Sequence, residues 1–266
     1  MPVVIINGSA EKYQTIAKYS TDPHQLTGRT SKTVTEQRVS YVCSNLKPYI
    51  TIDDTIFDVG CGDGSFTIAL SQFSSKVVAI CPSAEELDLL QNTVFCDKLN
   101  VKLAQGLTDN LLEPMSFGPP NIILCNNVLH GNGFTEQSAL DALAHFSSSQ
   151  QVGAILYLGE IPVNNEFEGR NYGHSFAKYL FWLATNRGLR ATLKNLVQYA
   201  FASTTNRVYT LQNEDSFWAL PETIVNFASQ YGYELLSAWN SGNNAQVTLP
   251  TDLTRGRIDY LFRKQR

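Results

Sequence analysis

The sequence has no long apolar run. Its N-terminus carries only the short apolar stretch Val3–Ile6, with no basic residue before it. The apolar core of a signal peptide takes about 7–15 residues, and a membrane-spanning helix takes about 20. We therefore expect neither feature, and we expect the protein to be cytoplasmic.

Cysteine is scarce and widely spaced. The five cysteines are odd in number and include no C-x-x-C pair: Cys43, Cys61, Cys81, Cys96 and Cys125. Zinc sites and disulfide frameworks both show characteristic close spacings, so the pattern favours neither. Most of the five lie in apolar stretches, where cysteine behaves as a small buried hydrophobic residue. We expect reduced thiols and no metal site.

An excess of positive charge is also absent. The 266 residues include 20 Lys and Arg against 24 Asp and Glu, which gives a net charge of −4. A basic patch is the usual footprint of nucleic-acid binding, so RNA or DNA is not the expected partner. The composition, 43% hydrophobic and 17% charged, is that of a soluble globular protein. The length suits one large α/β domain or a domain with an insertion.

What the sequence does have is an alternation of strand and helix patterns. Helices are predicted first, at 11–19 and 33–46, with a polar loop at 20–31 between them. From residue 54 the predicted strands are 56–59, 76–81, 101–104, 121–125 and 153–158, with helices at 83–90 and 140–146. A capping box, Ser83 to Glu86, starts the first of these two helices. The pattern stops after Pro162 and resumes with a helix at 221–232 and strands at 233–239 and 257–262. It predicts a doubly wound parallel sheet covered on both faces.

A glycine-rich turn follows the first of the strands at 56–59. It reads Asp58-Val59-Gly60-Cys61-Gly62-Asp63-Gly64, and a helical pattern begins at once after it. Glycine serves where the backbone bends sharply or approaches a ligand closely, and a helix start offers unpaired N–H groups. The spacing differs from the dinucleotide fingerprint G-x-G-x-x-G, because the third glycine comes one residue early and Ser65 stands in its place.

The pattern D-x-G-x-G-x-G between a strand and a helix resembles the first motif of class I S-adenosylmethionine (SAM) methyltransferases. The resemblance runs from Ile56 to Leu158 and again from Pro221 to Arg263. It implies a Rossmann-like, mostly parallel seven-stranded sheet with a closing hairpin, a helical cap insertion, and SAM as the cofactor. We divide the chain accordingly into an N-terminal helical segment that can act as a lid (1–50), the SAM-binding core (51–162), the cap (163–219) and the end of the core sheet (220–266).

The resemblance also implies the cofactor residues. Backbone at the glycine turn would approach the methionine part of SAM, with Asp58 orienting its amino group and Asn126, after the fourth core strand, facing its amino-acid end. Two positions depart from the family pattern: Cys81 replaces the acid that accepts the ribose hydroxyls, and Leu107 replaces the acid near adenine, unless Asp109 takes that role. Ser83, Glu85 or backbone groups are then the candidates for the ribose. The full set of predicted cofactor residues is Asp58, Gly60, Cys61, Gly62, Gly64, Cys81, Ser83, Leu107, Thr108 and Asn126.

Several side chains near this edge have two interpretations. His130, whose usual pKa suits proton transfer at neutral pH, is the candidate general base, or it packs beside the cofactor. Asp63 contacts SAM or caps the helix. Glu160 contacts the substrate or is a solvated loop acid. Tyr19 and His24 close over SAM or belong to a surface loop.

The segment from Arg170 to Asn213 combines aromatic side chains with basic ones. Its charged residues are all basic: Arg170, Lys178, Arg187, Arg190, Lys194 and Arg207. Its aromatic residues are Tyr172, Phe176, Tyr179, Phe181, Trp182, Tyr199, Phe201 and Tyr209. Helical patterns at 176–183 and 189–201 predict a cap whose aromatics pack on the domain. Two further roles are open for this segment. It forms a hydrophobic substrate pocket with one or two cations, or it presents a basic amphipathic surface to a membrane or an acidic partner. Aromatic and basic side chains also suit single-stranded RNA.

These observations predict methyl transfer from SAM to an oxygen or nitrogen of a small, largely apolar molecule that can carry an acid group. Two alternatives stay open. The chain could be a weakly SAM-binding scaffold subunit, because Cys81 and Leu107 lack the usual acids, or it could be an RNA methyltransferase. Tight SAM binding with turnover of a small acceptor would exclude the scaffold, and salt-sensitive RNA binding would support the RNA enzyme.

Overall fold

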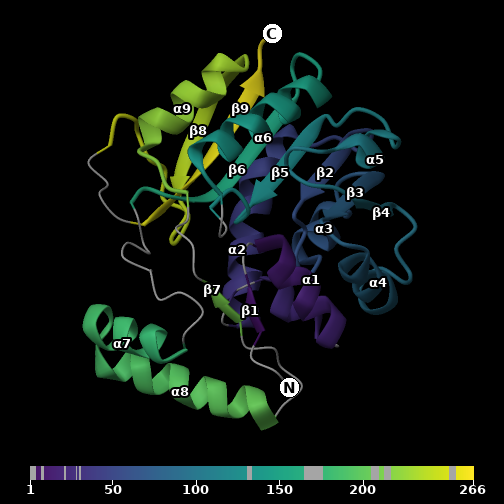
Figure 1. The fold of residues 1–266 in the computed structure, drawn as a ribbon. Helices are drawn as coiled ribbons and strands as arrows, with labels where there is room; N and C mark the ends of the chain where they lie inside the picture. The colour runs from purple at the N-terminus through teal and green to yellow at the C-terminus, as the bar shows by residue number, and fades with distance from the viewer. Residues whose placement is uncertain are drawn as a thin grey trace.

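The computed structural model in Figure 1 describes most of the chain. The described residues are 4–6, 9–20, 22–27, 29, 31–130, 134–164, 176–204, 210–212, 217–251 and 256–266. Arg170, Tyr172, Arg207 and Tyr209, which belong to the predicted aromatic and basic segment, lie outside these ranges.

A seven-stranded sheet forms the centre of the molecule. Its strand order is β4-β3-β2-β5-β6-β9-β8. The bounds are β2 Thr55–Val59, β3 Lys76–Cys81, β4 Val101–Gln105, β5 Ile122–Asn126, β6 Ile155–Pro162, β8 Tyr233–Asn240 and β9 Arg257–Lys264. Strand β9 pairs antiparallel with both β6 and β8, and the other pairings in this sheet are parallel. The predicted doubly wound, mostly parallel sheet with a closing hairpin is confirmed.

Helices cover both faces of this sheet, because successive strand side chains point to opposite sides. On one face α5 (Leu112–Met115), α6 (Glu136–Ser149) and α9 (Pro221–Gln230) lie over the sheet. The other face carries α2 (Lys32–Leu46), α3 (Ser65–Leu70) and α4 (Ala84–Thr93). Within β2 alone, Phe57 belongs to the core under α6 and Ile56 to the core under α2. All five residues of β2 are buried, as expected for a central strand of a two-sided sheet.

The N-terminal segment packs over the strands at one edge. Helix α1 (Ser9–Tyr19) lies against α4, and the short 3-10 helix η1 (Pro23–Thr27) follows within the predicted loop. Ile16 of α1 and Leu26 of η1 share a buried cluster with Cys61 and Cys81. A second 3-10 helix, η2 (Lys47–Tyr49), connects α2 to the sheet. This segment therefore touches the glycine turn and the end of β3 directly.

The helices and strands of the core lie close to their predicted positions, except that the short helix α5 was not predicted. Two further differences concern strands. Strand β6 extends to Pro162 because a register shift between Leu158 and Ile161 lets the pairing with β9 continue. A small parallel pair, β1 (Val4–Ile6) with β7 (Thr210–Gln212), was not predicted. Strands of three residues are too short to show a period of two.

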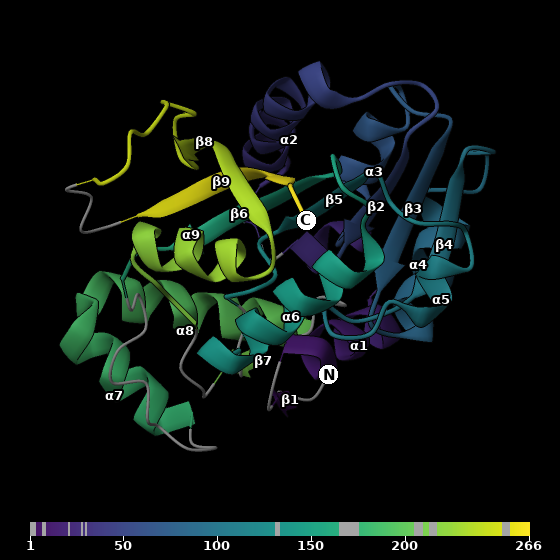
Figure 2. The same ribbon diagram turned by 90° about the horizontal axis from the view of Figure 1, so that it is seen from above.

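Two helices of the cap form a hairpin. Helix α7 (Phe176–Asn186) and helix α8 (Gly188–Thr204) are joined at Arg187 and Gly188, and the latter has φ +82°. Figure 1 shows the hairpin standing away from the large sheet, beyond the β1–β7 pair, and in Figure 2, seen from above, α8 lies behind α9. The prediction that the aromatic side chains of this segment pack on the domain is wrong for Phe181, which is 73% exposed. Over the described residues, no helix combines the length and apolar character needed to cross a membrane.

Candidate cofactor and substrate site

The glycine turn between β2 and α3 depends on backbone that other residues rarely adopt. Gly60, Gly62 and Gly64 have φ values of +72°, +59° and +77°. The amides of Gly60 and Cys61 both donate to the carbonyl oxygen of Ile80, at 2.9 and 3.1 Å, which fixes the turn against β3.

The surroundings of the three glycines differ. A Cβ on Gly60 would lie 2.5 Å from Val128 Cγ2, and one on Gly64 would lie 2.5 Å from Phe95 Cζ. Both glycines are therefore also required by packing. The nearest atom to a Cβ on Gly62 is instead the backbone oxygen of Leu26, at 3.3 Å. Gly62 thus faces the N-terminal segment, across the carboxyl end of the sheet.

Asp58 is a buried carboxylate at the end of β2. Its Oδ2 accepts a hydrogen bond from the Thr67 hydroxyl at 2.6 Å, and the residue is almost fully buried. Burial raises the pKa of Asp58 to about 7, with the Thr67 hydrogen bond acting in the opposite direction. A carboxyl group whose charge is suppressed by burial would gain from a cation placed beside it.

Two thiols meet at the predicted ribose position. The Sγ atoms of Cys61 and Cys81 are 3.1 Å apart, and both side chains are buried. The contact with Cys81, together with burial, raises the pKa of Cys61 well above its ordinary value. Cys61 is therefore a thiol rather than a reactive thiolate, and Cys81 adds no charge to the end of β3.

Two buried acids, Glu86 and Asp58, act electrostatically on these thiols. The predicted N-cap is present, because the Ser83 hydroxyl accepts from the Glu86 amide at 3.3 Å. The Glu86 side chain accepts from the Ser83 hydroxyl at 2.8 Å rather than from the Ser83 amide, so the reciprocal bond of the predicted capping box is not the one formed at this described helix start. Glu86 is buried, and burial raises its pKa to about 7. Glu85, the predicted candidate, is exposed and accepts hydrogen bonds from Gln14 on α1 instead. The sequence pattern assigned Glu86 only to the start of the helix, and for that reason Glu86 was not predicted as a candidate for the ribose contact.

The residues predicted to lie near the adenine of SAM belong to the turn after β4. Leu107 and Asn110 exchange backbone hydrogen bonds of 2.9 and 3.1 Å, which closes a tight turn. Within it Thr108 is buried, whereas Leu107 and Asp109 are exposed. The Gly106 amide donates to the carbonyl oxygen of Cys81 at 2.9 Å, so this turn adjoins the end of β3.

Asn126, at the end of β5, belongs to a buried ionic network. Its Oδ1 accepts from Arg38 Nη2 at 2.8 Å. The same guanidinium nitrogen donates to Asp259 Oδ1 at 2.6 Å. Burial is the largest influence and acts to lower the pKa of Arg38, but Asp259, Tyr157 and Glu160 together outweigh it and the pKa is raised. Asp259 also accepts from the Tyr157 hydroxyl, the Ser241 hydroxyl and the Glu160 amide, each within 2.8 Å.

Glu160 extends this network toward the N-terminal segment. It has φ +60° at the register shift in β6, a strained conformation that the surrounding contacts must maintain. Its carboxylate forms an ion pair with Arg29, accepts from Asn126 Nδ2 at 3.3 Å, and lies 3.9 Å from Arg38 Nε. The interpretation of Glu160 as a solvated loop acid is therefore wrong.

Arg29, Arg38 and Asp259 had no predicted role. One sequence signal was available for Asp259, because an acid within the apolar run of β9 needs a buried partner. No comparable signal marks Arg29 or Arg38, whose partners lie far along the chain.

His130 lies at the same edge, after β5. Its Nε2 contacts Asn127 Oδ1 and lies 3.1 Å from Arg257 Nη1. Arg257 also donates to Asn127 Oδ1 at 2.9 Å. Asn127 has φ +61°, another strained position beside the strand end. The structure thus brings a histidine and a cation together, and the role of His130 as a general base stays a prediction.

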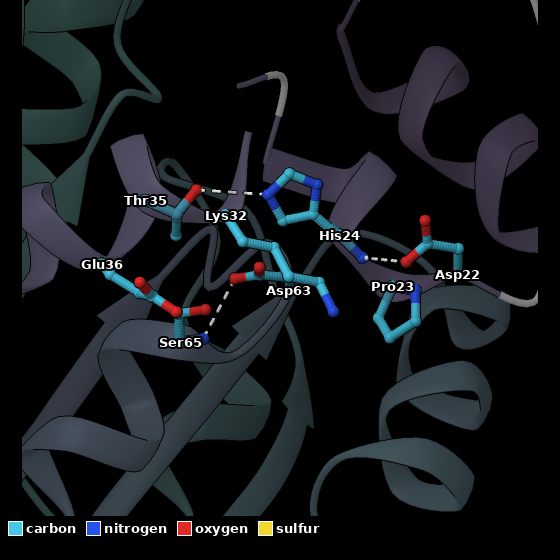
Figure 3. A pocket seen from close by; sticks show the side chains of 8 residues that line it. All are labelled: Asp22, Pro23, His24, Lys32, Thr35, Glu36, Asp63 and Ser65. Atoms are coloured by element: carbon cyan, nitrogen blue, oxygen red, sulfur yellow. Dashed lines mark hydrogen bonds between the residues drawn. The ribbon is translucent and has the colours of Figure 1, made fainter. Parts of the chain in front are cut away.

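A pocket of about 270 Å³ opens beside the glycine turn, between η1, the start of α2 and residues 63–65. Figure 3 shows its lining side chains. His24 Nε2 lies 3.4 Å from the Thr35 hydroxyl. Asp63 Oδ1 accepts from the Ser65 amide at 3.1 Å, so this carboxylate supports the start of α3. His24 therefore lies beside the turn, and Tyr19 is an exposed residue at the end of α1.

Comparison with known proteins agrees with this arrangement. Residues 57–144 match the family model described as a methyltransferase domain. No curated protein sequence matches the chain. The fold is similar to that of a SAM-dependent methyltransferase from Clostridium acetobutylicum, with a TM-score of 0.58, 14% identity, and coverage of 90% of this chain and 94% of that one.

Two further solved structures share the fold. The N-methyltransferase NodS from Bradyrhizobium japonicum, bound to S-adenosylhomocysteine (SAH), gives a TM-score of 0.54 at 11% identity, covering 96% of this chain and 98% of that one. Magnesium protoporphyrin IX methyltransferase from Synechocystis, also with SAH, gives 0.53 at 13% identity, covering 88% and 84%. Residues 57–144 thus match a methyltransferase domain, and the chain has the fold of the SAM-dependent methyltransferases with which it was compared.

Proposed function

We propose that this protein transfers a methyl group from SAM to an oxygen or nitrogen of a small, largely apolar molecule that can carry an acid group. The observation that carries the proposal is the left-handed glycine turn, which meets the buried Asp58 at the carboxyl end of β2. Ligands of doubly wound sheets bind at this edge. When bound, SAM supplies an electrophilic methyl group on a sulfonium.

The residues present suit the polar groups of SAM. Asp58 offers a carboxylate to the cationic amino group, and Gly62 lets the backbone approach the ligand. Asn126, fixed by Arg38, faces the same edge. Glu86 takes the ribose contact that Cys81 cannot make, since a thiol is a poor hydrogen-bond acceptor.

The N-terminal segment excludes water from this edge. Leu26 is buried against the glycine turn, and Arg29 ties the segment to Glu160 on β6. Exclusion of water strengthens the electrostatic interactions within a site. Methyl transfer from a sulfonium depends chiefly on the alignment of the two reactants.

At the acceptor side, His130 is the proposed holder of the proton that the acceptor releases. Arg257, whose Nη1 lies 3.1 Å from His130 Nε2, supplies a cation that suits an acid group on the acceptor.

Titration calorimetry with SAM and SAH tests the cofactor part of the proposal, and we expect micromolar binding. Transfer of labelled methyl to a panel of phenols, carboxylic acids and amines tests the acceptor part. No SAM binding at millimolar concentration would favour the scaffold alternative, and salt-sensitive methylation of RNA would favour the RNA alternative.

A cytoplasmic location is part of the proposal. All five cysteines are free, including the closely placed Cys61 and Cys81. Thiols in such proximity are typical of a reducing compartment.

SAM affinity should depend on pH through Asp58. Its pKa of about 7 means that it is largely protonated in acid, whereas the bound amino group favours the carboxylate. We expect the Kd to fall by roughly tenfold between pH 5.5 and 7, measured by calorimetry. Asp58→Asn should reduce this dependence to the part that Glu86 contributes, and a slope that the substitution leaves unchanged would contradict the assignment. Glu86 has a similar pKa, so its titration also contributes to the change in Kd over this pH range.

Without ligand, these two carboxyl groups affect stability in the opposite sense. Their folded-state pKa values lie above the ordinary carboxyl values, so the folded state binds more protons between about pH 4 and 7. Their contribution to stability therefore decreases as the pH rises through this range. As the pH rises from about 4 to 7, SAM affinity should therefore increase while the contribution of these two groups to the stability of the unliganded protein decreases.

The ribose assignment gives a matched pair of variants on one helix. Glu86→Gln should weaken SAM and SAH binding by roughly 10-fold, because a hydrogen bond to a charged acceptor contributes about 1.5–3 kcal/mol. Glu85→Gln, one residue away and exposed, should leave the Kd within twofold of the wild type. Calorimetry measures both. Equal effects of the two substitutions would contradict the role of Glu86.

A further inference from the structure

Helix α8 carries an apolar face whose side chains are exposed in the part of the chain that the structure describes. The face consists of Leu189, Leu193, Leu196 and Val197, whose exposed fractions are 80%, 64%, 39% and 47%. Phe181, on the adjoining helix α7, is 73% exposed. Monomeric proteins rarely expose contiguous apolar side chains without a function in binding.

The spacing puts these residues on one side of the helix. At about 100° per residue, the four side chains of this face span a sector of about 100°. The opposite side of α8 is the one held by α7, because Asn195 Oδ1 accepts from the Tyr179 hydroxyl at 2.9 Å. The apolar face is therefore not the contact between the two helices.

Basic side chains border the apolar face. Arg190 and Lys194 are exposed and lie next to it on the helix surface. Between residues 170 and 213 the six charged side chains are all basic, so that this segment carries +6 and the remaining chain −10, given the net charge of −4. The cationic and apolar groups are thus concentrated in one part of an acidic protein.

This combination selects among binding partners. The four side chains of the face are aliphatic, and Phe181 is the single exposed aromatic residue placed beside them among the described side chains. The face therefore lacks the series of aromatic side chains on which the bases of single-stranded RNA stack. Two copies joined through this face would place like charges side by side, which is unfavourable. A lipid surface with anionic headgroups satisfies both features, since leucines insert at the acyl boundary while cations meet the headgroups.

We propose that the apolar face of α8, with Arg190 and Lys194 beside it, docks this protein on an anionic lipid bilayer. Docking of this kind is peripheral: the helix lies along the membrane surface. It does not depend on methyl transfer, so the proposed function and the docking can fail separately. The surface falls on the cap hairpin, away from the glycine turn and from the buried ionic network (Figure 1).

Cosedimentation of the full chain with vesicles tests the proposal. We expect binding to phosphatidylcholine vesicles that contain phosphatidylglycerol, little binding to phosphatidylcholine alone, and weakening by salt. Leu189→Ser/Leu193→Ser should reduce partitioning at least about tenfold. Arg190→Glu/Lys194→Glu should reduce it similarly and remove most of the salt dependence. All four side chains are exposed, so the folded state should persist, as circular dichroism would verify.

Matched controls come from exposed residues elsewhere. Leu99 and Leu112 are 92% and 83% exposed, and Lys98 and Lys102 are exposed near them. Leu99→Ser/Leu112→Ser and Lys98→Glu/Lys102→Glu should bind vesicles like the wild type. Equal losses in these controls would overturn the proposal, as would a wild-type chain that ignores anionic vesicles. A dimer that Leu189→Ser/Leu193→Ser converts to a monomer, without vesicle binding, would assign the face to a second copy instead.

Discussion

Replacement of Gly62 by arginine should abolish SAM binding, with a Kd at least about 100-fold higher than that of the wild type. Gly62 has φ +59°, where a side chain costs about 1–2 kcal/mol. Its side chain would enter the narrow space between the turn and Leu26, since even a Cβ would approach the Leu26 oxygen to 3.3 Å. The new guanidinium would also compete for Asp58 with the cationic ligand. Calorimetric titration measures the loss.

Gly118→Arg is the matched control for this experiment. Gly118 also has a positive φ, +102°, and a Cβ there would meet no atom within 4 Å. The control adds the same charge in the turn before β5, away from the glycine turn, and its backbone strain is at least as large, since φ +102° lies outside the left-handed well that contains φ +59°. We expect it to bind SAM with the wild-type Kd. Wild-type binding by Gly62→Arg would place the cofactor elsewhere and contradict the site.

Replacement of Arg38 by methionine should reduce the free energy of unfolding by about 3–5 kcal/mol, because it leaves the Asp259 carboxylate buried without its cation. Asp259 is fully buried and Arg38 nearly so, and the two side chains are joined at 2.6 Å. Urea denaturation followed by circular dichroism measures the change. Lys102→Met, on exposed surface, should change it by less than about 0.5 kcal/mol.

A second substitution separates the charge effect from lost packing. In the Arg38→Met background, Asp259→Asn removes the uncompensated charge and should restore part of the lost stability. Asp259→Asn alone should destabilise the protein, since Arg38 then keeps its charge without the carboxylate. If the double variant were less stable than Arg38→Met by the full effect of Asp259→Asn alone, the two residues would be energetically independent.

One departure from the family pattern lies at the end of β3, where Cys81 places a neutral thiol against Cys61. Glu86, in the first turn of α4, is a buried acid that acts on both thiols. The proposed ribose contact of Glu86 would compensate for Cys81. The capping pattern alone did not suggest that role, because it already assigns the glutamate to the helix start.

The sequence by itself determined the local features of this protein. Strands β2, β3 and β5 were predictable because buried parallel strands appear as continuous apolar runs. The turn from Gly60 to Gly64 was predictable because few residues other than glycine adopt a positive φ there. The helix that begins after Ser83 was predictable from its N-cap residue, and the structure confirms the hydrogen bond from the Glu86 amide to the Ser83 hydroxyl. Each of these signals lies within a few consecutive residues.

Only the tertiary structure decided which distant residues meet. Arg38 and Asp259 are 221 positions apart, and Arg29 reaches Glu160 across 131. Such pairs depend on the order and register of strands and on how α2 packs on the sheet, which no local pattern encodes. The exposure of the apolar face of α8 was also decided only by the tertiary structure. Its leucines have the spacing of a core-facing helix, and only the position of α7 shows that they face outward.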